Sequence, residues 1–353
     1  MVNKLIQRIN LAAQVLVNGR LATAEEFDIP EINPEEVAEA KTFFPMEKFF
    51  IFGHARSGTT LLTRLIRLHP KVHCNYQAHF FTRPPLLEGL VSDLEVRKWL
   101  SRSSNRWNRG QDLSPVILRA ISDFILERDA RREGKEIVGD KSPNSLLNGE
   151  AVRLLQKVYP DARLIFLVRD GRDAVLSHRF QTFIDNPQHL TKEDEQILDS
   201  FLQDPQPFFD GERSLFTQKG ITRAAHGWVD NVVETNDMAR QLFDQHYTAL
   251  RFEDLLKNPW DVMAQAWSFL GASSDIAGLS DAVNSELTQN PDADWQQEKA
   301  SKISFSLNKG KPGSWRDIFT QKDLQIFERI AGETLEEWGY ETSMPDRFKK
   351  REK

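Results

Sequence analysis

The sequence predicts a three-layer α/β/α fold with a central parallel sheet. Three observations indicate it. Short apolar runs of strand length alternate with segments that repeat apolar residues at helical spacing. The run at 163–168, RLIFLV, is apolar throughout, as in a strand buried on both faces. A glycine-containing turn at 53–60 separates the first strand from a helix, which is typical of parallel α/β proteins.

Each element follows from its local pattern. Strands are predicted where short apolar runs end in glycine, proline or polar residues: 48–52, 71–74, 136–138, 163–168 and 247–251. Helices are predicted where apolar periodicity starts near a capping residue and stops near glycine or proline: 35–41, 60–68, 222–245, 254–270 and 322–338. Ser142, followed by Pro143, predicts a further helix start after the third strand.

The chain is long enough for one large α/β domain, which we expect at 46–345. Residues 1–45 are predicted to form an N-terminal helix and an acidic connector, and 346–353 a basic tail. Within the domain, the charged helical segment at about 88–135 is expected to form a cap. The polar, proline-containing segment at about 185–220 is expected to be an insertion of low regularity.

The composition excludes several classes of function. The chain has 353 residues and a net charge of −6 with both signs interspersed, which offers no field for binding nucleic acid. Its apolar runs fall short of the ~20 residues of an integral membrane segment. The single cysteine, Cys74, excludes an intramolecular disulfide and suits a reducing compartment, so we expect a cytoplasmic protein. The apolar stripe within 1–20 is expected to pack on its own domain or to dock on a partner protein or membrane surface.

The turn at 53–60, GHARSGTT, carries the main functional signal. Gly53 and Gly58 have the spacing of a loop whose backbone N–H groups surround phosphate oxygens at the start of a helix. Thr59 stands where an ATP-binding loop has lysine, and the nearest cation is Arg56. The turn therefore predicts an anion site for a donor other than Mg-ATP. The alternative is an ordinary strand-turn-helix junction with a capping hydroxyl.

Two further segments offer groups for an anion. Arg169 directly follows the strand at 163–168, and Ser177 lies eight positions later, so both are expected at the ligand edge of the sheet. The alternative is that Arg169 pairs with a neighbouring aspartate on the surface. Near the C-terminus, Lys309 and Gly310 begin the run KGKPGSWR, in which glycines allow close backbone approach and lysine supplies charge.

Together the three segments resemble the nucleotide-binding elements of sulfotransferases, which take a sulfuryl group from 3′-phosphoadenosine 5′-phosphosulfate (PAPS). The match runs from 53 to 316, about three quarters of the chain. It implies the sulfotransferase version of the P-loop NTPase-like fold, with PAPS as donor and no metal. It also implies which residues bind the nucleotide. The 5′-phosphate loop would consist of Arg56, Ser57, Gly58, Thr59 and Thr60. Arg169 and Ser177 would hold the 3′-phosphate, and Lys309 and Gly310 would cover the nucleotide.

A shorter motif places the chain closer to the bacterial and tyrosylprotein types of that family than to the cytosolic ones. The run GDKSP at 139–143 is similar to an element whose lysine, here Lys141, points at the transferred group. With Arg56, Lys141 is therefore the expected cation where the leaving group gains charge. RFEDL at 251–255 resembles a family motif in which Phe252 replaces the usual tyrosine, so any contact of that phenolic oxygen is absent.

The sequence leaves the general base open. Bacterial and tyrosylprotein members place a glutamate shortly after the first helix, and Gln77 occupies that position here. His79 lies two residues on, on the same face if the segment is extended, and its ordinary pKa near 6.5 suits base work. Asp140 or a group on the acceptor are the alternatives, with His79 then structural. His54, inside the loop, is a further candidate base but is better interpreted as a turn residue.

The sequence thus predicts an enzyme that moves a sulfuryl group from PAPS to a hydroxyl of a small-molecule, lipid or carbohydrate acceptor, in line and without metal. A small-molecule kinase on a P-loop scaffold is the alternative. It would need a lysine that reaches the phosphates and a magnesium-binding carboxylate. A non-catalytic nucleotide-binding module is the third possibility, but such a module has no need of four inward-pointing cations: Arg56, Lys141, Arg169 and Lys309.

Overall fold

The computed structural model describes residues 28–104, 106–289 and 312–342. Its centre is a five-stranded sheet in the order β2-β3-β1-β4-β5, and all neighbouring strands run parallel. The central parallel sheet is confirmed, and the last two strands have the predicted bounds. The strands are β1 (Glu47–Gly53), β2 (Val72–Tyr76), β3 (Ile137–Lys141), β4 (Arg163–Val168) and β5 (Tyr247–Arg251).

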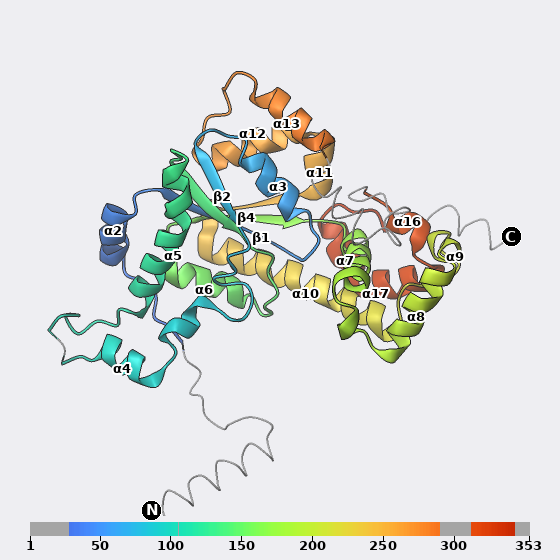
Figure 1. Cartoon of the computed structure of the whole chain (residues 1–353), viewed down its shortest axis with the longest axis horizontal. Helices are drawn as coiled ribbons and strands as arrows, with labels where there is room; N and C mark the ends of the chain where they lie inside the picture. The colour runs from blue at the N-terminus through green and yellow to red at the C-terminus, as the bar shows by residue number, and fades with distance from the viewer. Residues whose placement is uncertain (1–27, 105, 290–311, 343–353) are drawn as a thin grey trace, which may run out of the picture.

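Helices lie on both sides of this sheet (Figure 1). They are α2 (Pro34–Phe43), α3 (Thr59–Ile66), α4 (Leu94–Ser101), α5 (Ser114–Arg132), α6 (Glu150–Val158), α7 (Gly171–Asp185), α8 (Lys192–Gln203), α9 (Gln206–Phe209), α10 (Gln218–Phe243), α11 (Phe252–Lys257), α12 (Pro259–Phe269), α13 (Leu279–Thr288), α16 (Trp315–Ile318) and α17 (Gln321–Glu337). Short 3₁₀ helices lie at Leu87–Val91, Pro187–His189 and Asp244–His246.

The side chains of β1 show how the layers form, because successive residues of a strand point to opposite faces. Phe49 and Ile51 belong to one buried cluster with residues of α3, α12 and α13. Phe50 and Phe52 belong to a second buried cluster with residues of α5, α6 and α10. The sheet is therefore covered on both faces, and the predicted three-layer α/β/α fold is confirmed.

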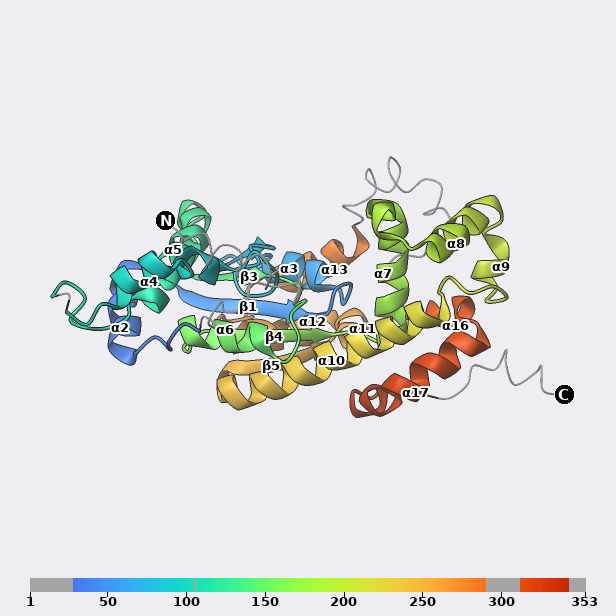
Figure 2. The same ribbon diagram turned by 90° about the horizontal axis from the view of Figure 1, so that it is seen from below.

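The carboxyl ends of the strands face a group of helices at one end of the molecule. Figure 2 shows β1 pointing toward α7, with α8, α9 and α16 beyond it. α3 starts directly after β1 and α7 directly after β4. Two helix N-termini therefore meet at the edge of the sheet where the sequence places the ligand site.

The prediction of a helix starting at Ser142 and Pro143 is wrong. β3 continues to Lys141, and the next helix, α6, begins only at Glu150. The Ser142 hydroxyl does not cap a helix but donates a hydrogen bond to Asp140. The helix predicted over 254–270 is also divided, into α11 and α12, because Pro259 starts a new helix.

The prediction of low regularity at about 185–220 is also wrong. This segment contains α8 and α9, and its prolines lie at helix starts, where a missing N–H costs nothing. Phe201 of α8 is buried among four further rings from α7 and α9: Phe180, Phe183, Phe208 and Phe209. Aromatic packing thus orders a segment whose polar composition suggested a loop.

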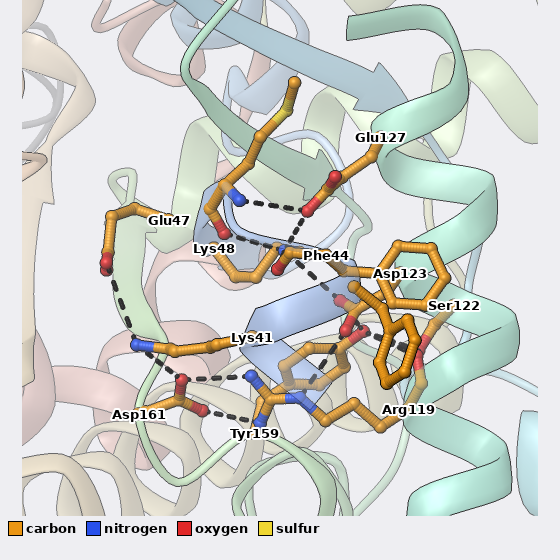
Figure 3. A network of polar contacts seen from close by, with 12 residues as sticks. Lys41, Phe44, Glu47, Lys48, Arg119, Ser122, Asp123, Glu127, Tyr159 and Asp161 are labelled. Carbon is orange, nitrogen blue, oxygen red and sulfur yellow. Dashed lines mark hydrogen bonds and ion pairs between the residues drawn. The ribbon is translucent and has the colours of Figure 1, made fainter. Parts of the chain in front are cut away.

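A buried polar network joins the start of β1 to α5 (Figure 3). The Lys48 ammonium donates to Glu127 at 2.7 Å and lies 3.4 Å from the Asp123 carboxylate. Arg119, on the same helix, pairs through two hydrogen bonds of 2.7 and 3.0 Å with Asp161. An unpaired charge at such a depth costs several kcal/mol. The network therefore fixes α5 at the amino-terminal end of the sheet, opposite the ligand edge.

The predicted cap at about 88–135 contains α4 and α5, and α5 packs on β2, β3 and α6 as part of the helical layer. The limits given for the domain and its cap stay predictions. The predicted N-terminal helix and the basic tail at 346–353 lie outside the described residues. Within the part of the chain that the structure describes, no helix combines the length and apolar character needed to span a membrane.

Candidate functional site

The turn between β1 and α3 forms a tight loop that only glycine allows at one position. Gly58 has φ +91°, in the left-handed region, and caps the start of α3. A Cβ atom there would lie 2.3 Å from the Phe252 ring, so a side chain is excluded by space as well. Arg56 also has a positive φ, +72°. The loop is therefore held in an uncommon conformation by the residues around it.

The start of α3 has the properties of an anion site. Its N-cap residue, Gly58, has no side chain to cap the first N–H groups, which carry the positive end of the helix dipole. The Ser57 hydroxyl is buried and has no hydrogen-bond partner among the residues that the structure describes. Thr59, the first residue of the helix, is also buried. Buried polar groups are normally satisfied, so these groups fit a bound anion.

The second predicted segment meets this loop. The Arg56 guanidinium donates from Nε to Ser177 Oγ at 3.1 Å. Arg169 donates from Nη1 to the backbone oxygen of Arg56 at 3.1 Å, and its guanidinium lies 4.9 Å from the centre of the Phe252 ring. Its Nε atom is buried without a hydrogen-bond partner in the described residues. The structure thus brings Arg56, Arg169 and Ser177 together, and their role in holding an anion stays a prediction.

Lys141 reaches the same loop from the end of β3. Its ammonium donates to Thr60 Oγ1 at 3.2 Å, and the residue is only 1% exposed. Burial lowers the pKa of Lys141, the charge of Arg56 acts in the same direction, and the Asp140 carboxylate opposes both. Arg56 and Lys141 are therefore close enough to repel each other, and an anion between them would relieve that repulsion.

The segment that carries the candidate base is not extended, so the expectation that residues 77 and 79 share a strand face is wrong. β2 ends at Tyr76, and Gln77 and His79 have φ values of +56° and +53°. Gln77 is exposed. The His79 ring is half-buried, with Nδ1 at 2.8 Å from Thr82 Oγ1. Burial lowers the pKa of His79, and the charges of Arg83 and Lys141 lower it further.

The two other base candidates have structural contacts. Both carboxylate oxygens of Asp140 accept hydrogen bonds, one from the backbone N–H of Ala78 at 3.0 Å and one from the Ser142 hydroxyl at 2.5 Å. Burial raises the pKa of Asp140 to about 6. His54 lies 2.8 Å from the Ala55 oxygen through Nδ1, and burial lowers the pKa of its ring to about 4. His54 thus lies between β1 and α3, and its interpretation as a turn residue stays a prediction.

The third predicted segment is only partly described. Lys309 and Gly310 lie outside the described residues. The residues that follow them are tied to α7, because the Asp173 carboxylate accepts hydrogen bonds from the backbone N–H groups of Gly313 at 2.6 Å and Trp315 at 3.1 Å. Burial raises the pKa of Asp173 to about 6, against the opposing charge of Arg169.

Sequence reasoning missed two residues of this site. Asp173 was considered only as a surface partner of Arg169, whereas it is buried and holds the third segment. The sequence signal that could have identified Asp173 is its place in the first turn of α7, the helix that also carries Ser177. Phe252 was noted only for its missing hydroxyl, but its ring lies between Gly58 and Arg169.

In the described part of the chain, no group of three or more His, Cys, Asp or Glu side chains is arranged to hold a metal ion. The absence of a metal requirement stays a prediction.

Comparison with known proteins gives a family match. The model of the "Sulfotransferase family" matches residues 48–275. Protein-tyrosine sulfotransferase A of Caenorhabditis elegans is 32% identical over 136 residues, 36% of this chain and 32% of the relative. A putative protein-tyrosine sulfotransferase of Caenorhabditis briggsae is 22% identical over 298 residues, 83% of this chain and 89% of the relative. The first of these alignments spans about a third of the curated relative.

Solved structures give a weaker likeness. A mouse sulfotransferase, SULT7A1, complexed with PAP aligns with a TM-score of 0.44 at 15% identity, over 86% of this chain and 90% of that one. The sulfotransferase domain of the Synechococcus PCC 7002 olefin synthase aligns with a TM-score of 0.45 at 17% identity, over 88% and 98%. The family model, by contrast, covers more than half of the chain and includes the loop, Lys141 and Arg169. The resemblance seen in the sequence is confirmed: the chain belongs to the sulfotransferase family.

Proposed function

We propose that this protein transfers a sulfuryl group from PAPS to an acceptor hydroxyl. One observation carries the proposal: three cationic side chains from separate segments meet at the start of α3. Arg56 is bound to Ser177 at 3.1 Å, Arg169 to the Arg56 backbone at 3.1 Å, and Lys141 to Thr60 at 3.2 Å. Cations gathered in a partly buried site favour a multiply charged anion, because each contact is worth several times more there than in water.

The residues present fit the two phosphate groups of this donor. The N–H groups and hydroxyls of 57–60 would hold the 5′-phosphate at the α3 N-terminus, and Arg169 with Ser177 would hold the 3′-phosphate. The Ser57 hydroxyl and the Arg169 Nε, which have no hydrogen-bond partner among the described residues, support this assignment, since each would gain an acceptor oxygen. Lys309 and Gly310 are proposed to cover the nucleotide.

In the proposed reaction, the acceptor oxygen forms a bond to sulfur while the bond from sulfur to the bridging phosphate oxygen breaks. The electron pair of that bond stays with the leaving adenosine 3′,5′-bisphosphate, and the acceptor proton passes to a base. Arg56 and Lys141 are proposed to stabilise the charge that develops on the bridging oxygen. Their fixed positions on the loop and on β3 mean that little reorganisation is needed during transfer.

We assign the base to His79. Its lowered pKa keeps the imidazole neutral at pH 7, which a proton acceptor requires. The backbone N–H of His79 donates at 2.9 Å to Ser142, the residue that follows Lys141, which supports a position close to the transferred group. The hydrogen bonds at both carboxylate oxygens of Asp140 make that residue a poorer proton acceptor.

The acceptor is proposed to be a hydroxyl of a small molecule, lipid or carbohydrate. The names of the relatives, which are protein-tyrosine sulfotransferases, add a tyrosine hydroxyl to the acceptors that must be tested. Tyr76 is 45% exposed, and the centre of its ring lies 5.4 Å from the Lys141 ammonium, so an aromatic surface adjoins the proposed transfer site. A cytoplasmic location is part of the proposal, supported by the single buried cysteine, Cys74.

Donor identity is tested by thermal unfolding. A ligand at 100 times its dissociation constant stabilises the fold by about 2.7 kcal/mol. We expect adenosine 3′,5′-bisphosphate to raise the melting temperature without added metal. Stabilisation by Mg-ATP alone would favour the kinase instead. In that case Lys141, which contacts Thr60 at the start of α3, would have to serve as the lysine that reaches the phosphates.

Catalysis is tested with labelled PAPS and four acceptors: 4-nitrophenol, a long-chain alcohol, a simple sugar and a tyrosine-containing peptide. We expect transfer to at least one of them by the wild type. Arg56→Ala and Lys141→Ala should each lose on the order of 10²- to 10³-fold in kcat. Lys98→Ala, which removes an exposed ammonium on α4, is the control and should keep full activity. Binding of adenosine 3′,5′-bisphosphate without any transfer would indicate a non-catalytic module.

A further inference from the structure

The turn that carries His79 is held by three consecutive backbone N–H groups. Gln77 donates to the Lys141 oxygen at 2.7 Å, Ala78 to Asp140 Oδ1 at 3.0 Å, and His79 to Ser142 Oγ at 2.9 Å. All three acceptors belong to the end of β3 or the residue after it. The turn is therefore attached to the residues on either side of Lys141.

The two side chains in this attachment are linked to each other. The Ser142 hydroxyl donates to Asp140 Oδ2 at 2.5 Å. A hydroxyl has one proton to donate. Because Ser142 donates that proton in its hydrogen bond to Asp140, the lone pairs of the Ser142 oxygen remain to accept the hydrogen bond from the His79 N–H. Asp140 and Ser142 are 2% and 1% exposed, which protects these bonds from competition with water.

The backbone of the turn needs such support. Gln77 and His79 both have positive φ values, which residues with a Cβ atom seldom adopt. Three hydrogen bonds from a strand of the central sheet keep them there. Without these bonds the turn would be free to leave these uncommon backbone angles, and the His79 ring would move with it.

We propose that Asp140 and Ser142 are positioning residues that set His79 relative to Lys141 for sulfuryl transfer. This inference deepens the proposed function and rests on it. Asp140 and Ser142 orient the backbone of His79. Thr82 orients the His79 ring through the contact of 2.8 Å between Oγ1 and Nδ1. The end of β3 thus carries the cation, Lys141, and the residues that hold the base, His79. The distance between Lys141 and His79 is therefore set by the central sheet.

The inference predicts a loss in kcat that leaves donor binding intact. A base displaced by about 1 Å costs on the order of 10²-fold in rate. We therefore expect Ser142→Ala and Asp140→Asn to lower kcat tenfold to a hundredfold, with the affinity for adenosine 3′,5′-bisphosphate within twofold of the wild type. Neither side chain hydrogen-bonds to residues 53–60 in the described structure, so the donor loop should stay in place. Ser142→Thr keeps the hydroxyl and should recover most of the rate.

Ser122→Ala is the matched control. Ser122 is another buried serine with several hydrogen bonds, including one of 2.6 Å with Tyr159, but it lies in the network at the opposite end of the sheet (Figure 3). This variant should lose stability without losing kcat when it is assayed well below its melting temperature. A comparable loss of kcat in Ser122→Ala would show that any destabilising substitution has the effect, and would overturn the inference.

A double substitution provides the decisive measurement. If Ser142 acts through His79, the variant His79→Ala/Ser142→Ala should be no slower than His79→Ala alone. Losses that multiply, or full kcat in Ser142→Ala, would overturn the inference and leave the proposed function standing. A wild type that neither transfers sulfate to any of the four acceptors nor is stabilised by adenosine 3′,5′-bisphosphate would overturn the proposed function itself.

Discussion

Arg169 donates a hydrogen bond of 3.1 Å to the backbone oxygen of Arg56, so the end of β4 holds the loop that follows β1. The same guanidinium lies over the Phe252 ring at 4.9 Å. One planar cation therefore links the loop, β4 and α11, and its Nε, which has no hydrogen-bond partner among the described residues, could reach the donor phosphate. Loop geometry and donor binding are therefore both expected to involve this side chain.

Replacing this side chain should weaken donor binding. A hydrogen bond to a charged group is worth about 1.5–3 kcal/mol, so we expect Arg169→Ala to raise the Kd for adenosine 3′,5′-bisphosphate about ten- to a hundredfold. Arg169→Lys should recover little of this, because an ammonium lacks the planar set of donors that reaches the loop and the phosphate together. Titration calorimetry measures both. Arg163→Ala, at the opposite end of β4, is the control and should bind normally.

Gly58 should be irreplaceable for two independent reasons. Alanine is disfavoured at φ +91° by about 1–2 kcal/mol, and its Cβ would lie 2.3 Å from the Phe252 ring, which adds about 1–3 kcal/mol of overpacking. Gly58→Ala should therefore lower the free energy of unfolding by roughly 2–5 kcal/mol. The pair Gly58→Ala/Phe252→Leu should recover only the steric part, because the backbone strain remains. Denaturant unfolding measures the difference.

Gly227→Ala is the matched control for this substitution. Gly227 lies inside α10, and a Cβ there would meet no atom within 4 Å. Because alanine is a better helix former than glycine, this variant should be as stable as the wild type or up to about 1 kcal/mol more stable. Equal stability of Gly58→Ala and the wild type would contradict the geometry described for the loop.

The sequence predicted the elements that depend on local pattern and missed those that depend on distant partners. β4 has its predicted bounds because an apolar run buried on both faces has a sharp compositional edge. Arg56 and Ser177 were expected at one site because parallel strands share a carboxyl edge. Ser142 was wrongly predicted to start a helix, since its local Ser-Pro pattern does not reveal the bond from His79 N–H, 63 positions away.

The turn at 77–79 shows the same limit. His79 was expected on the same face as Gln77 if the segment is extended, but both residues have left-handed backbone angles, and the turn is hydrogen-bonded to Asp140 and Ser142. Asp173 was missed as a structural residue because its partners, Gly313 and Trp315, lie about 140 positions later in the chain. Residues whose role is to hold another segment carry little local signal, since their neighbours in sequence do not identify the segment that they hold.

The rate of transfer should fall in acid. His79 acts as a base only when its ring is neutral, and burial together with Arg83 and Lys141 lowers its pKa below the ordinary 6.5. The ring therefore stays neutral at pH 7 and gains a proton only at a pH below 6.5. We expect kcat/KM to be flat near neutral pH and to decline as the pH drops through that lowered pKa. Initial rates between about pH 5 and 8 trace this limb.

His79→Gln tests the assignment of that limb. Glutamine keeps a polar side chain of similar reach but does not titrate, so the acid limb should disappear together with most of the rate. If His79→Gln kept the full rate and the same decline in acid, the titrating group would be a residue other than His79. Thr82→Val, which removes the contact with Nδ1, should keep the limb and lower kcat, because it disturbs the orientation of the ring and leaves its basicity largely intact.

Asp173 should control the segment that follows Lys309 and Gly310. Its two carboxylate oxygens each accept one backbone N–H, from Gly313 and from Trp315. Asp173→Ala removes both acceptors, so we expect the segment to be released and the Kd for adenosine 3′,5′-bisphosphate to rise about tenfold or more, at roughly 1–3 kcal/mol for each buried donor left unsatisfied. Asp173→Asn keeps one acceptor oxygen and should show a smaller loss.

Two measurements separate this effect from a general loss of stability. Binding calorimetry gives the Kd, and hydrogen exchange gives the protection of the N–H groups of Gly313 and Trp315, which should fall in Asp173→Ala. Asp185→Ala, an exposed aspartate at the end of the same helix, is the control and should change neither. Normal donor affinity in Asp173→Ala, with protection lost, would mean that the third segment contributes nothing to donor binding, because its tether would be gone without consequence.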